Sequence, residues 1–266
     1  MPKLSIIIPT FNSDLTIERC LLSIGAQTLT DYEIVIQDGG SSDRTVEIVH
    51  RWQAEYGSVR VDLQQMPDKG TYDAMNKGIS RASGEWLYFM GSDDEFYDAQ
   101  VLEKTVGNPI AQECSVLYGN VMVVGSSGIA TDGAIYDGPF DLKKLLNCNI
   151  CHQAIFYKAE MIGTVGNYNT DYAICADWDL NLRCFANTQF TYIDTIVAKF
   201  NTGGLSSQHR PDLKFILDVA NNVMQYFNLS ADDPRINSPA FIGYREVLKM
   251  QRSPIERALR ALVRKR

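Results

Sequence analysis

Apolar runs and amphipathic stretches alternate regularly over the first 95 residues. The runs typical of buried strands are residues 5–8, 32–36 and 86–90, and residues 59–63 alternate apolar and polar side chains as a further strand does. Between them, apolar side chains three and four positions apart predict helices, the first with Ile17, Cys20, Leu21 and Ile24 on one face. Strands and helices in alternation predict right-handed βαβ units. We therefore expect an α/β fold whose mixed, mainly parallel sheet is flanked by helices.

After about residue 110 the pattern becomes irregular. Strands are expected at 116–124, 128–136 and 153–157, and helices at 141–146, 176–185 and 213–227. No stretch is long enough to separate two independent domains. We expect one domain in two halves, residues 1–110 and a mixed extension over 111–212, followed by C-terminal helices over 213–266.

Each of the four predicted strands of the first half ends in polar residues. These are Thr10 and Asn12, Asp38, Asp68, and the pair Asp93 and Asp94. Ligands of open parallel sheets bind outside the carboxyl ends of the strands, so these side chains are expected around one crevice. Converging carboxylates raise one another's pKa and cost stability unless they bind a cation. Mg²⁺ or Mn²⁺ together with a diphosphate would satisfy them. Neither a P-loop nor a dinucleotide-binding glycine motif is present.

Charge and cysteine usage narrow the class of protein. A net charge of −7 argues against a nucleic-acid binder.

The apolar N-terminal run breaks at Pro9 and resembles a first strand more than a signal peptide, so a cytoplasmic location is expected. The six cysteines are spaced like reduced thiols. Residues 148–152 match the C-x-x-C-H spacing of haem attachment, but without an export signal or a second ligand pair a haem or zinc site is the minor interpretation.

The motifs at the strand ends resemble those of glycosyltransferase family 2 in order and spacing. The matching stretches are SIIIPTFN at 5–12, QDGGSSD at 37–43, PDKGTYDAMNKG at 67–78, FMGSDD at 89–94 and CADWDLNLR at 175–183. The family consists of inverting enzymes with a GT-A fold, which is Rossmann-like, and nucleotide-sugar donors. The resemblance covers residues 1–100 most strongly.

The resemblance implies roles for particular residues. Thr10 and Asn12 would line the nucleotide pocket, Asp38 would hydrogen-bond the base, and Asp68 would lie near the diphosphate. Asp93 and Asp94 stand at the metal-binding motif, where Gly91 occupies a position often held by Asp or Asn. Which of the two binds Mg²⁺ or Mn²⁺ directly and which meets the ribose stays open. The implied halves are a nucleotide-sugar-binding one (1–110) and an acceptor-side one (111–212).

A general base is also needed, because the attacking hydroxyl must lose a proton. Asp177 is the candidate, since it begins an amphipathic helix, and Asp179 is the fallback. An acid favoured by the helix dipole is an equally simple interpretation of Asp177 from sequence alone. His152 and Gln153 are candidate contacts of donor sugar or acceptor, with a buried structural histidine as the alternative. His209 follows a glycine-rich polar loop of lid type, where an exposed histidine is the simpler interpretation and a metal ligand the other. Tyr72, Trp86 and Trp178 are expected in the core.

The C-terminal end carries its own signal. Residues 245–266 contain eight basic and two acidic residues, and 253–266 form a basic amphipathic pattern. Such a helix lies in an anionic membrane interface, or it docks on the domain or on a partner subunit. The first interpretation predicts peripheral association with the cytoplasmic face of a membrane and a lipid-linked acceptor.

The sequence thus predicts a metal-dependent inverting glycosyltransferase. It would move a hexose or N-acetylhexosamine from a nucleotide diphosphate, with UDP favoured, to a hydroxyl of a glycan or lipid-linked acceptor. The alternatives are a sugar-nucleotide nucleotidyltransferase, whose glycine-rich N-terminal loop is missing, and a non-catalytic nucleotide-sugar-binding protein. A glycosidase would need two carboxylates flanking one sugar and no nucleotide pocket.

Overall fold

The first half of the chain forms four parallel strands in the order β3-β2-β1-β4. Their bounds are Leu4–Thr10 (β1), Tyr32–Asp38 (β2), Arg60–Gln65 (β3) and Trp86–Phe89 (β4). The register pairs Thr10 with Asp38, and Asp38 with Gln65, so these strands end at one edge. The chain turns back between β3 and β4 to reach the other side of β1. This reversal creates the crevice in which open α/β sheets bind ligands.

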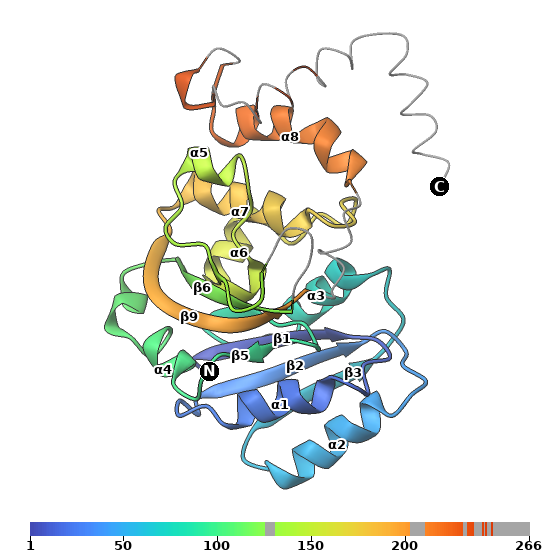
Figure 1. Ribbon diagram of the computed structural model, residues 1–266. Helices are drawn as coiled ribbons and strands as arrows, with labels where there is room; N and C mark the ends of the chain where they lie inside the picture. The colour runs from blue at the N-terminus through green and yellow to red at the C-terminus, as the bar shows by residue number, and fades with distance from the viewer. Residues whose placement is uncertain are drawn as a thin grey trace.

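Three helices connect these strands. They are α1 (Ile17–Gly25), α2 (Thr45–Glu55) and α3 (Thr71–Ile79). Right-handed crossovers place α1 and α2 on one side of the sheet and α3 on the other (Figure 1). The predicted apolar face of α1 is fully buried. On α3, a Cβ at Gly78 would lie 2.4 Å from a methyl carbon of Ile7, so only glycine permits this close packing on β1.

The second half continues the same sheet rather than forming a separate one. Its strands are β6 (Val116–Val124), β7 (Ile135–Tyr136), β8 (Ile155–Lys158) and β9 (Thr191–Asn201), and the short strand β5 (Glu95–Phe96) of the first half joins them. Strand β8 pairs antiparallel with both β4 and β6, β9 runs parallel to β6, and β5 pairs with β9. The result is the expected mixed α/β sheet.

The helices of the second half cover the side of the sheet that α3 also occupies (Figure 1). The longer ones are α6 (Ala159–Val165), α7 (Ala176–Asn187) and α8 (Leu213–Tyr226). A short one is α5 (Leu142–Leu145), whereas the short helix α4 (Val101–Lys104) belongs to the first half and packs near the end of α1, where the Leu102 amide donates to Gln27. Short 3-10 turns occupy Pro109–Gln112, His152–Ala154 and Pro234–Ile236. Helix α7 lies between α6 and α8, and its first turn points toward the carboxyl edge of the parallel strands.

The computed structural model describes residues 1–125, 131–202, 211–230, 233–236, 241, 243 and 246. His209 and the basic segment beyond residue 246 lie outside the described residues, so their predicted roles stay predictions. Of the strand expected at 128–136, the described part is Ile135–Tyr136. Gln153 belongs to a 3-10 turn rather than to the strand expected to begin there, and β9 and α6 were not predicted. Among the described residues no helix has the length and apolarity to cross a membrane.

Candidate functional site

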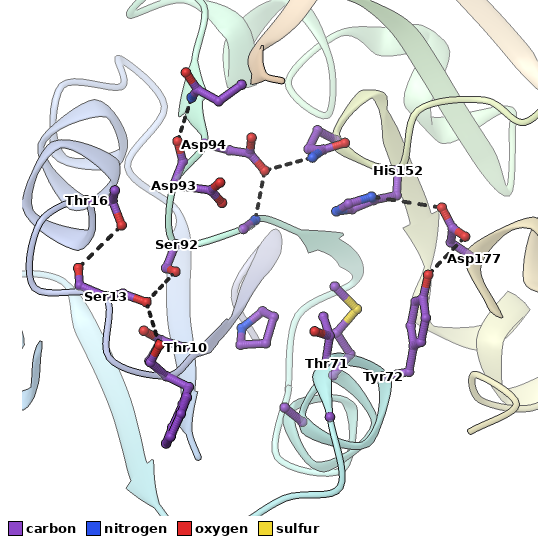
Figure 2. Close-up of a pocket in the computed structure, with 18 of the residues that line it drawn as sticks. Thr10, Ser13, Thr16, Thr71, Tyr72, Ser92, Asp93, Asp94, His152 and Asp177 are labelled. Atoms are coloured by element: carbon purple, nitrogen blue, oxygen red, sulfur yellow. Dashed lines mark hydrogen bonds and ion pairs between the residues drawn. The ribbon is translucent and has the colours of Figure 1, made fainter. Parts of the chain in front are cut away.

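A pocket of about 680 Å³ opens at the carboxyl edge of the parallel strands. Its walls come from both halves of the chain. Among the lining residues are Thr10, Phe11, Asn12, Asp68, Tyr72, Asp93, Asp94, His152, Gln153, Ile174, Asp177 and Phe200. Figure 2 shows Asp93 and Asp94 on one side of this pocket and His152 and Asp177 on the other. Three of the four strand ends that the sequence predicts to converge, all but that of Asp38, therefore share a pocket with the candidate base.

The turn after β4 brings two carboxylates together. A Cβ on Gly91 would lie 2.7 Å from Asp94 Oδ2 and 2.8 Å from Asp93 Oδ1, so both oxygens approach the position that glycine leaves open. The backbone carbonyl of Asp93 accepts hydrogen bonds from Arg19 (2.8 Å) and Asn201 (2.7 Å), which fix the turn. In this conformation a larger residue at position 91 would displace one or both carboxylates.

Asp94 is the buried member of the pair, with 2% of its surface exposed. Its Oδ2 accepts hydrogen bonds from the Gly91 amide (3.1 Å) and from Gln153 Nε2 (2.8 Å). The thiol of Cys151 donates to Gln153 Oε1 (2.7 Å), which turns the Gln153 amide nitrogen toward Asp94. Burial, and secondarily the charge of Asp93, raise the pKa of Asp94 to about 7.

The third acid of this run, Glu95, serves a different purpose. Its carboxylate forms ion pairs with Arg19 at 3.4 Å and with Lys199 at 3.5 Å. It does not line the pocket. Two of the three consecutive acids therefore belong to the pocket, and the third ties the start of β5 to α1 and β9.

The pocket end beside β1 holds the residues expected to meet a nucleotide. Thr10 is buried, and its hydroxyl oxygen has no hydrogen-bond partner among the described residues. Asn12 adopts a positive φ of 48°, and its side-chain oxygen accepts a hydrogen bond from the Ser42 amide (3.0 Å). The ring of Phe11 is 61% exposed at the same place. Asp68 lines this end too, with Oδ1 bound to the Gly70 amide (2.9 Å).

Asp38 is placed differently from the expectation. It is fully buried and does not line the pocket. Its Oδ1 accepts hydrogen bonds from the amides of Gly40 (3.1 Å) and Ser41 (2.8 Å), and its Oδ2 accepts one from the Ser41 hydroxyl (2.5 Å). In this conformation the carboxylate holds the loop after β2. A direct contact with a nucleotide base stays a prediction. It requires the loop to give up a hydrogen bond to one of the carboxylate oxygens of Asp38.

Asp177 lies in the first turn of α7, with its side chain 15% exposed to the pocket. Its Oδ1 accepts hydrogen bonds from the Trp178 amide (2.9 Å) and the Tyr72 hydroxyl (3.1 Å), and its Oδ2 accepts one from Asn149 Nδ2 (2.9 Å). Burial raises the pKa of Asp177 to about 6. A carboxylate with such a pKa is ionised at neutral pH and basic enough to take a proton.

His152 is partly buried beside this carboxylate. Its Nδ1 lies 4.0 Å from Asp177 Oδ2, and burial lowers the pKa of the imidazole to about 4. The ring is therefore neutral near pH 7 and contributes hydrogen-bonding groups rather than charge. Together with Gln153 it forms the pocket wall between Asp94 and Asp177.

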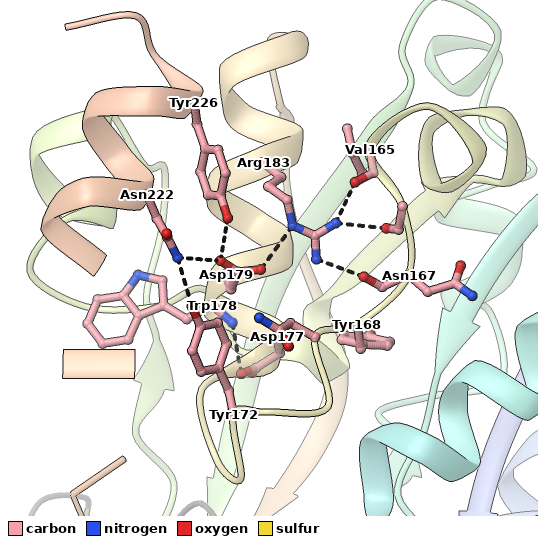
Figure 3. A network of polar contacts seen from close by, with 12 residues as sticks. Val165, Asn167, Tyr168, Tyr172, Asp177, Trp178, Asp179, Arg183, Asn222 and Tyr226 are labelled. Carbon is pink, nitrogen blue, oxygen red and sulfur yellow. Dashed lines mark hydrogen bonds and ion pairs between the residues drawn. The ribbon is translucent and has the colours of Figure 1, made fainter. Parts of the chain in front are cut away.

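Asp179, the fallback base, does not line the pocket. It is 1% exposed, and its Oδ2 accepts a hydrogen bond from Arg183 (2.9 Å). Its Oδ1 accepts hydrogen bonds from Tyr226 (2.9 Å) and Asn222 (3.3 Å) of α8. Figure 3 shows this network, in which Arg183 also donates to the carbonyl groups of residues 165–167. Asp179 therefore ties α7 to α8 and to residues 165–167, and in this arrangement it does not face the pocket.

The carboxylates of the turn after β4 could supply some, but not all, of the ligands of a divalent cation. Asp94 has a buried carboxylate with a like-charged neighbour, which is the arrangement that a hard cation relieves. Within the described ranges, however, no three or more His, Cys, Asp or Glu side chains are grouped to hold a metal. The residues fit an ion bound by one or two carboxylates, with the other positions left to phosphate oxygens and water, as Mg²⁺ prefers.

Several contacts at this site escaped sequence reasoning. Tyr72 was expected in the core, yet its hydroxyl binds Asp177 and the Ile174 carbonyl (2.5 Å). Trp86 is buried as expected, and Trp178 packs against the core. The cysteines of the C-x-x-C-H run are free thiols, and Cys151 is used to orient Gln153. Only a tertiary structure reveals the partners of Tyr72, since they lie more than 100 residues away in sequence.

Comparisons with known proteins bear on the family and the fold. Residues 5–156 match the model of Glycosyl transferase family 2. A protein of Mycobacterium bovis named PGL/p-HBAD biosynthesis glycosyltransferase is 43% identical over 211 residues, which cover 77% of this chain and 80% of that protein.

Two solved structures share the fold. S. aureus TarS 1–349 in complex with UDP-GlcNAc superposes with a TM-score of 0.67 at 19% identity, covering 92% of this chain and 70% of that one. A mannosyltransferase from Pyrobaculum calidifontis in complex with GDP-Man and Mn²⁺ has a TM-score of 0.55 at 16% identity, with coverages of 98% and 79%. Both show that the mixed sheet flanked by helices is of the GT-A type.

Proposed function

The chain belongs to glycosyltransferase family 2, and from this premise we propose that it is a metal-dependent inverting enzyme with a nucleotide-sugar donor. It moves a hexose or N-acetylhexosamine from a nucleoside diphosphate to a hydroxyl of a glycan or lipid-linked acceptor. One observation carries the proposal. Asp177, with a raised pKa, and the pair Asp93 and Asp94 line one pocket from different halves of the chain.

The base step follows from the surroundings of Asp177. Oδ1 accepts two hydrogen bonds, from Tyr72 and Trp178, whereas Oδ2 has one described donor, Asn149. Oδ2 is therefore the oxygen that accepts the proton of an acceptor hydroxyl as that hydroxyl attacks the anomeric carbon. The attack comes from the side opposite to the departing diphosphate, which inverts the configuration of that carbon. Such a base contributes about 10²–10⁴ in rate.

The donor is oriented by the opposite end of the pocket. Thr10, Asn12 and Asp68 surround the nucleoside, and the exposed ring of Phe11 offers it an apolar face. Asp93 and Asp94 meet the ribose and the diphosphate region. Asp93 and Asp94 would hold a Mg²⁺ or Mn²⁺ ion, which would neutralise charge on the leaving diphosphate. UDP is the favoured nucleotide, supported by the UDP-GlcNAc bound to TarS.

The acceptor enters beside Asp177, where Ile174 and Phe200 line the pocket. Residues 1–110 then serve the donor and residues 111–212 the acceptor, although one sheet runs through both ranges. The basic amphipathic sequence of residues 253–266 supports an acceptor presented at an anionic membrane surface.

The experiment that tests this function compares binding with turnover in Asp177→Asn. We expect the variant to bind UDP with Mn²⁺ as tightly as the wild-type protein, but to lose about 10²-fold or more of its transfer or slow donor hydrolysis. Asp171→Asn, an exposed acid six residues earlier, is the matched control and should keep full activity. NMR of the first product reports the anomeric configuration. Full transfer by Asp177→Asn, or retained configuration, would refute the assignment.

A further inference from the structure

A directed chain of hydrogen bonds approaches Asp177 from behind the pocket. The hydroxyl of Tyr157 on β8 donates to Asn181 Oδ1 at 2.6 Å, and Asn181 Nδ2 donates to Asn149 Oδ1 at 2.8 Å. Asn149 Nδ2 then donates to Asp177 Oδ2 at 2.9 Å. Tyr157 and Asn181 are fully buried, and Asn149 does not line the pocket. The chain therefore acts on the carboxylate and not on a substrate.

The direction of this chain is set by chemistry. If the Asn149 amide were turned around, its oxygen would face a carboxylate oxygen, and two acceptors would repel each other. With Asn149 in the observed orientation, its oxygen needs a donor, which Asn181 supplies. The oxygen of Asn181 in turn needs a donor, which is the Tyr157 hydroxyl. Each amide thus has its orientation fixed by the next residue.

The helix geometry makes the arrangement specific to Asp177. Asp177 and Asn181 are four residues apart on α7, so they lie on the same face of the helix, and Asn149 bridges them from the segment between α5 and β8. We propose that Asn149 is a positioning residue for the transfer reaction, which holds Asp177 ionised and aimed at the acceptor, and that Asn181 and Tyr157 fix its orientation. This inference rests on the proposed role of Asp177 as base.

The other titratable groups around Asp177 among the described residues carry no charge that could stabilise its carboxylate. They come from α3, β8, the 3-10 turn, the loops on either side and the approach to α7: Tyr72, Cys151, His152, Tyr157, Tyr168 and Cys175. Burial raises the pKa of each tyrosine and cysteine and lowers the pKa of His152, so all of them are uncharged near neutral pH. Among the residues that the structure describes, hydrogen bonds rather than a neighbouring cation therefore stabilise the Asp177 carboxylate.

The test is the pH profile of kcat/KM, measured with the full chain at saturating Mn²⁺ and with UDP-sugar as donor. The wild-type profile should have an acidic limb, meaning that kcat/KM falls as the pH drops below about 6. Asn149→Leu removes the donor and should move that limb upward by about one pH unit, because a hydrogen bond to a charged group favours the ionised form by about that much. Asn149→Asp has the same shape but adds a like charge, and should move the limb further.

Two further variants separate positioning from general damage. Tyr157→Phe keeps the buried ring and should give a smaller upward shift, since it only loosens the orientation of Asn181. Asn147→Leu, an exposed neighbour in the same segment, should leave the profile unchanged. UDP binding, followed by thermal shift, should be equal in all four variants and the wild type.

An unmoved limb in Asn149→Leu and Asn149→Asp, whether the rate falls equally at every pH or not at all, would overturn the inference. So would a shift in Asn149→Leu larger than that in Asn149→Asp. If Asn149→Leu does not fold, Asn149→Asp and Tyr157→Phe still decide the question. Failure of the proposed function is seen separately, because it would appear as full transfer activity in Asp177→Asn.

Discussion

Replacing Asp94 by asparagine should stabilise the protein at neutral and alkaline pH when no divalent cation is present. The buried carboxyl has a pKa of about 7 in the folded state against 3.8 for an ordinary Asp. Its folded form thus holds a proton that the unfolded chain releases, so the wild-type protein loses stability as pH rises from about 4 to about 7. A difference of roughly three units corresponds to about 4 kcal/mol in the free energy of unfolding, as an upper value.

The asparagine variant keeps the packing because one oxygen, Oδ2, accepts both described hydrogen bonds, from Gly91 and Gln153. Its amide oxygen can take that place. Urea denaturation at pH 4, 6 and 8 in the presence of EDTA measures the effect. We expect little difference at pH 4 and a gain of about 2–4 kcal/mol at pH 8. Asp31→Asn, an exposed acid, should show no such trend. A variant less stable than the wild-type protein at pH 8 would refute the reasoning.

Other perturbations test separate parts of the account. Asp179→Leu leaves the half-buried Arg183 guanidinium with its carbonyl acceptors but without its carboxylate partner, and should cost about 3–5 kcal/mol in urea denaturation; a loss below about 1 kcal/mol would contradict the role of this ion pair. Phe11→Ala should change stability by less than about 0.5 kcal/mol, because the ring is exposed, yet weaken UDP binding about tenfold in calorimetry. Equal affinity would remove Phe11 from the nucleotide site. Gly91→Ala places a methyl group against Asp93 and Asp94 and should weaken Mn²⁺ binding, followed by electron paramagnetic resonance, while Gly163→Ala, which meets open space, should not.

The parallel half was predictable from sequence because short-range patterns determine it. Apolar runs of four or five residues and helical spacing fix β1 to β4, and the topology of parallel strands then gathers their polar ends at one edge. Strand β9 was missed, although its β-branched residues favour a strand, because its partners β6 and β5 are distant in sequence.

The sequence predicted where the candidate site lies, but it did not determine which side chains face the pocket. Asp177 and Asp179 are two positions apart on a helix and point about 200° away from each other, so only one can face the pocket. The sequence favours neither strongly, and the orientation of α7 decides for Asp177. Likewise, the sequence places Asp38 at the correct strand end but does not reveal that the Ser41 hydroxyl and two loop amides occupy its carboxylate.

The account depends most on a nucleoside diphosphate and a divalent cation binding together in the pocket between Asp68 and Asp94. Isothermal titration of UDP into the wild-type protein, with Mn²⁺ and with EDTA, tests this directly. We predict measurable binding with Mn²⁺ that weakens at least tenfold with EDTA and also in Asp94→Asn. Binding of equal strength with and without the cation, or no binding of UDP, GDP or any other nucleoside diphosphate, would contradict the central claim.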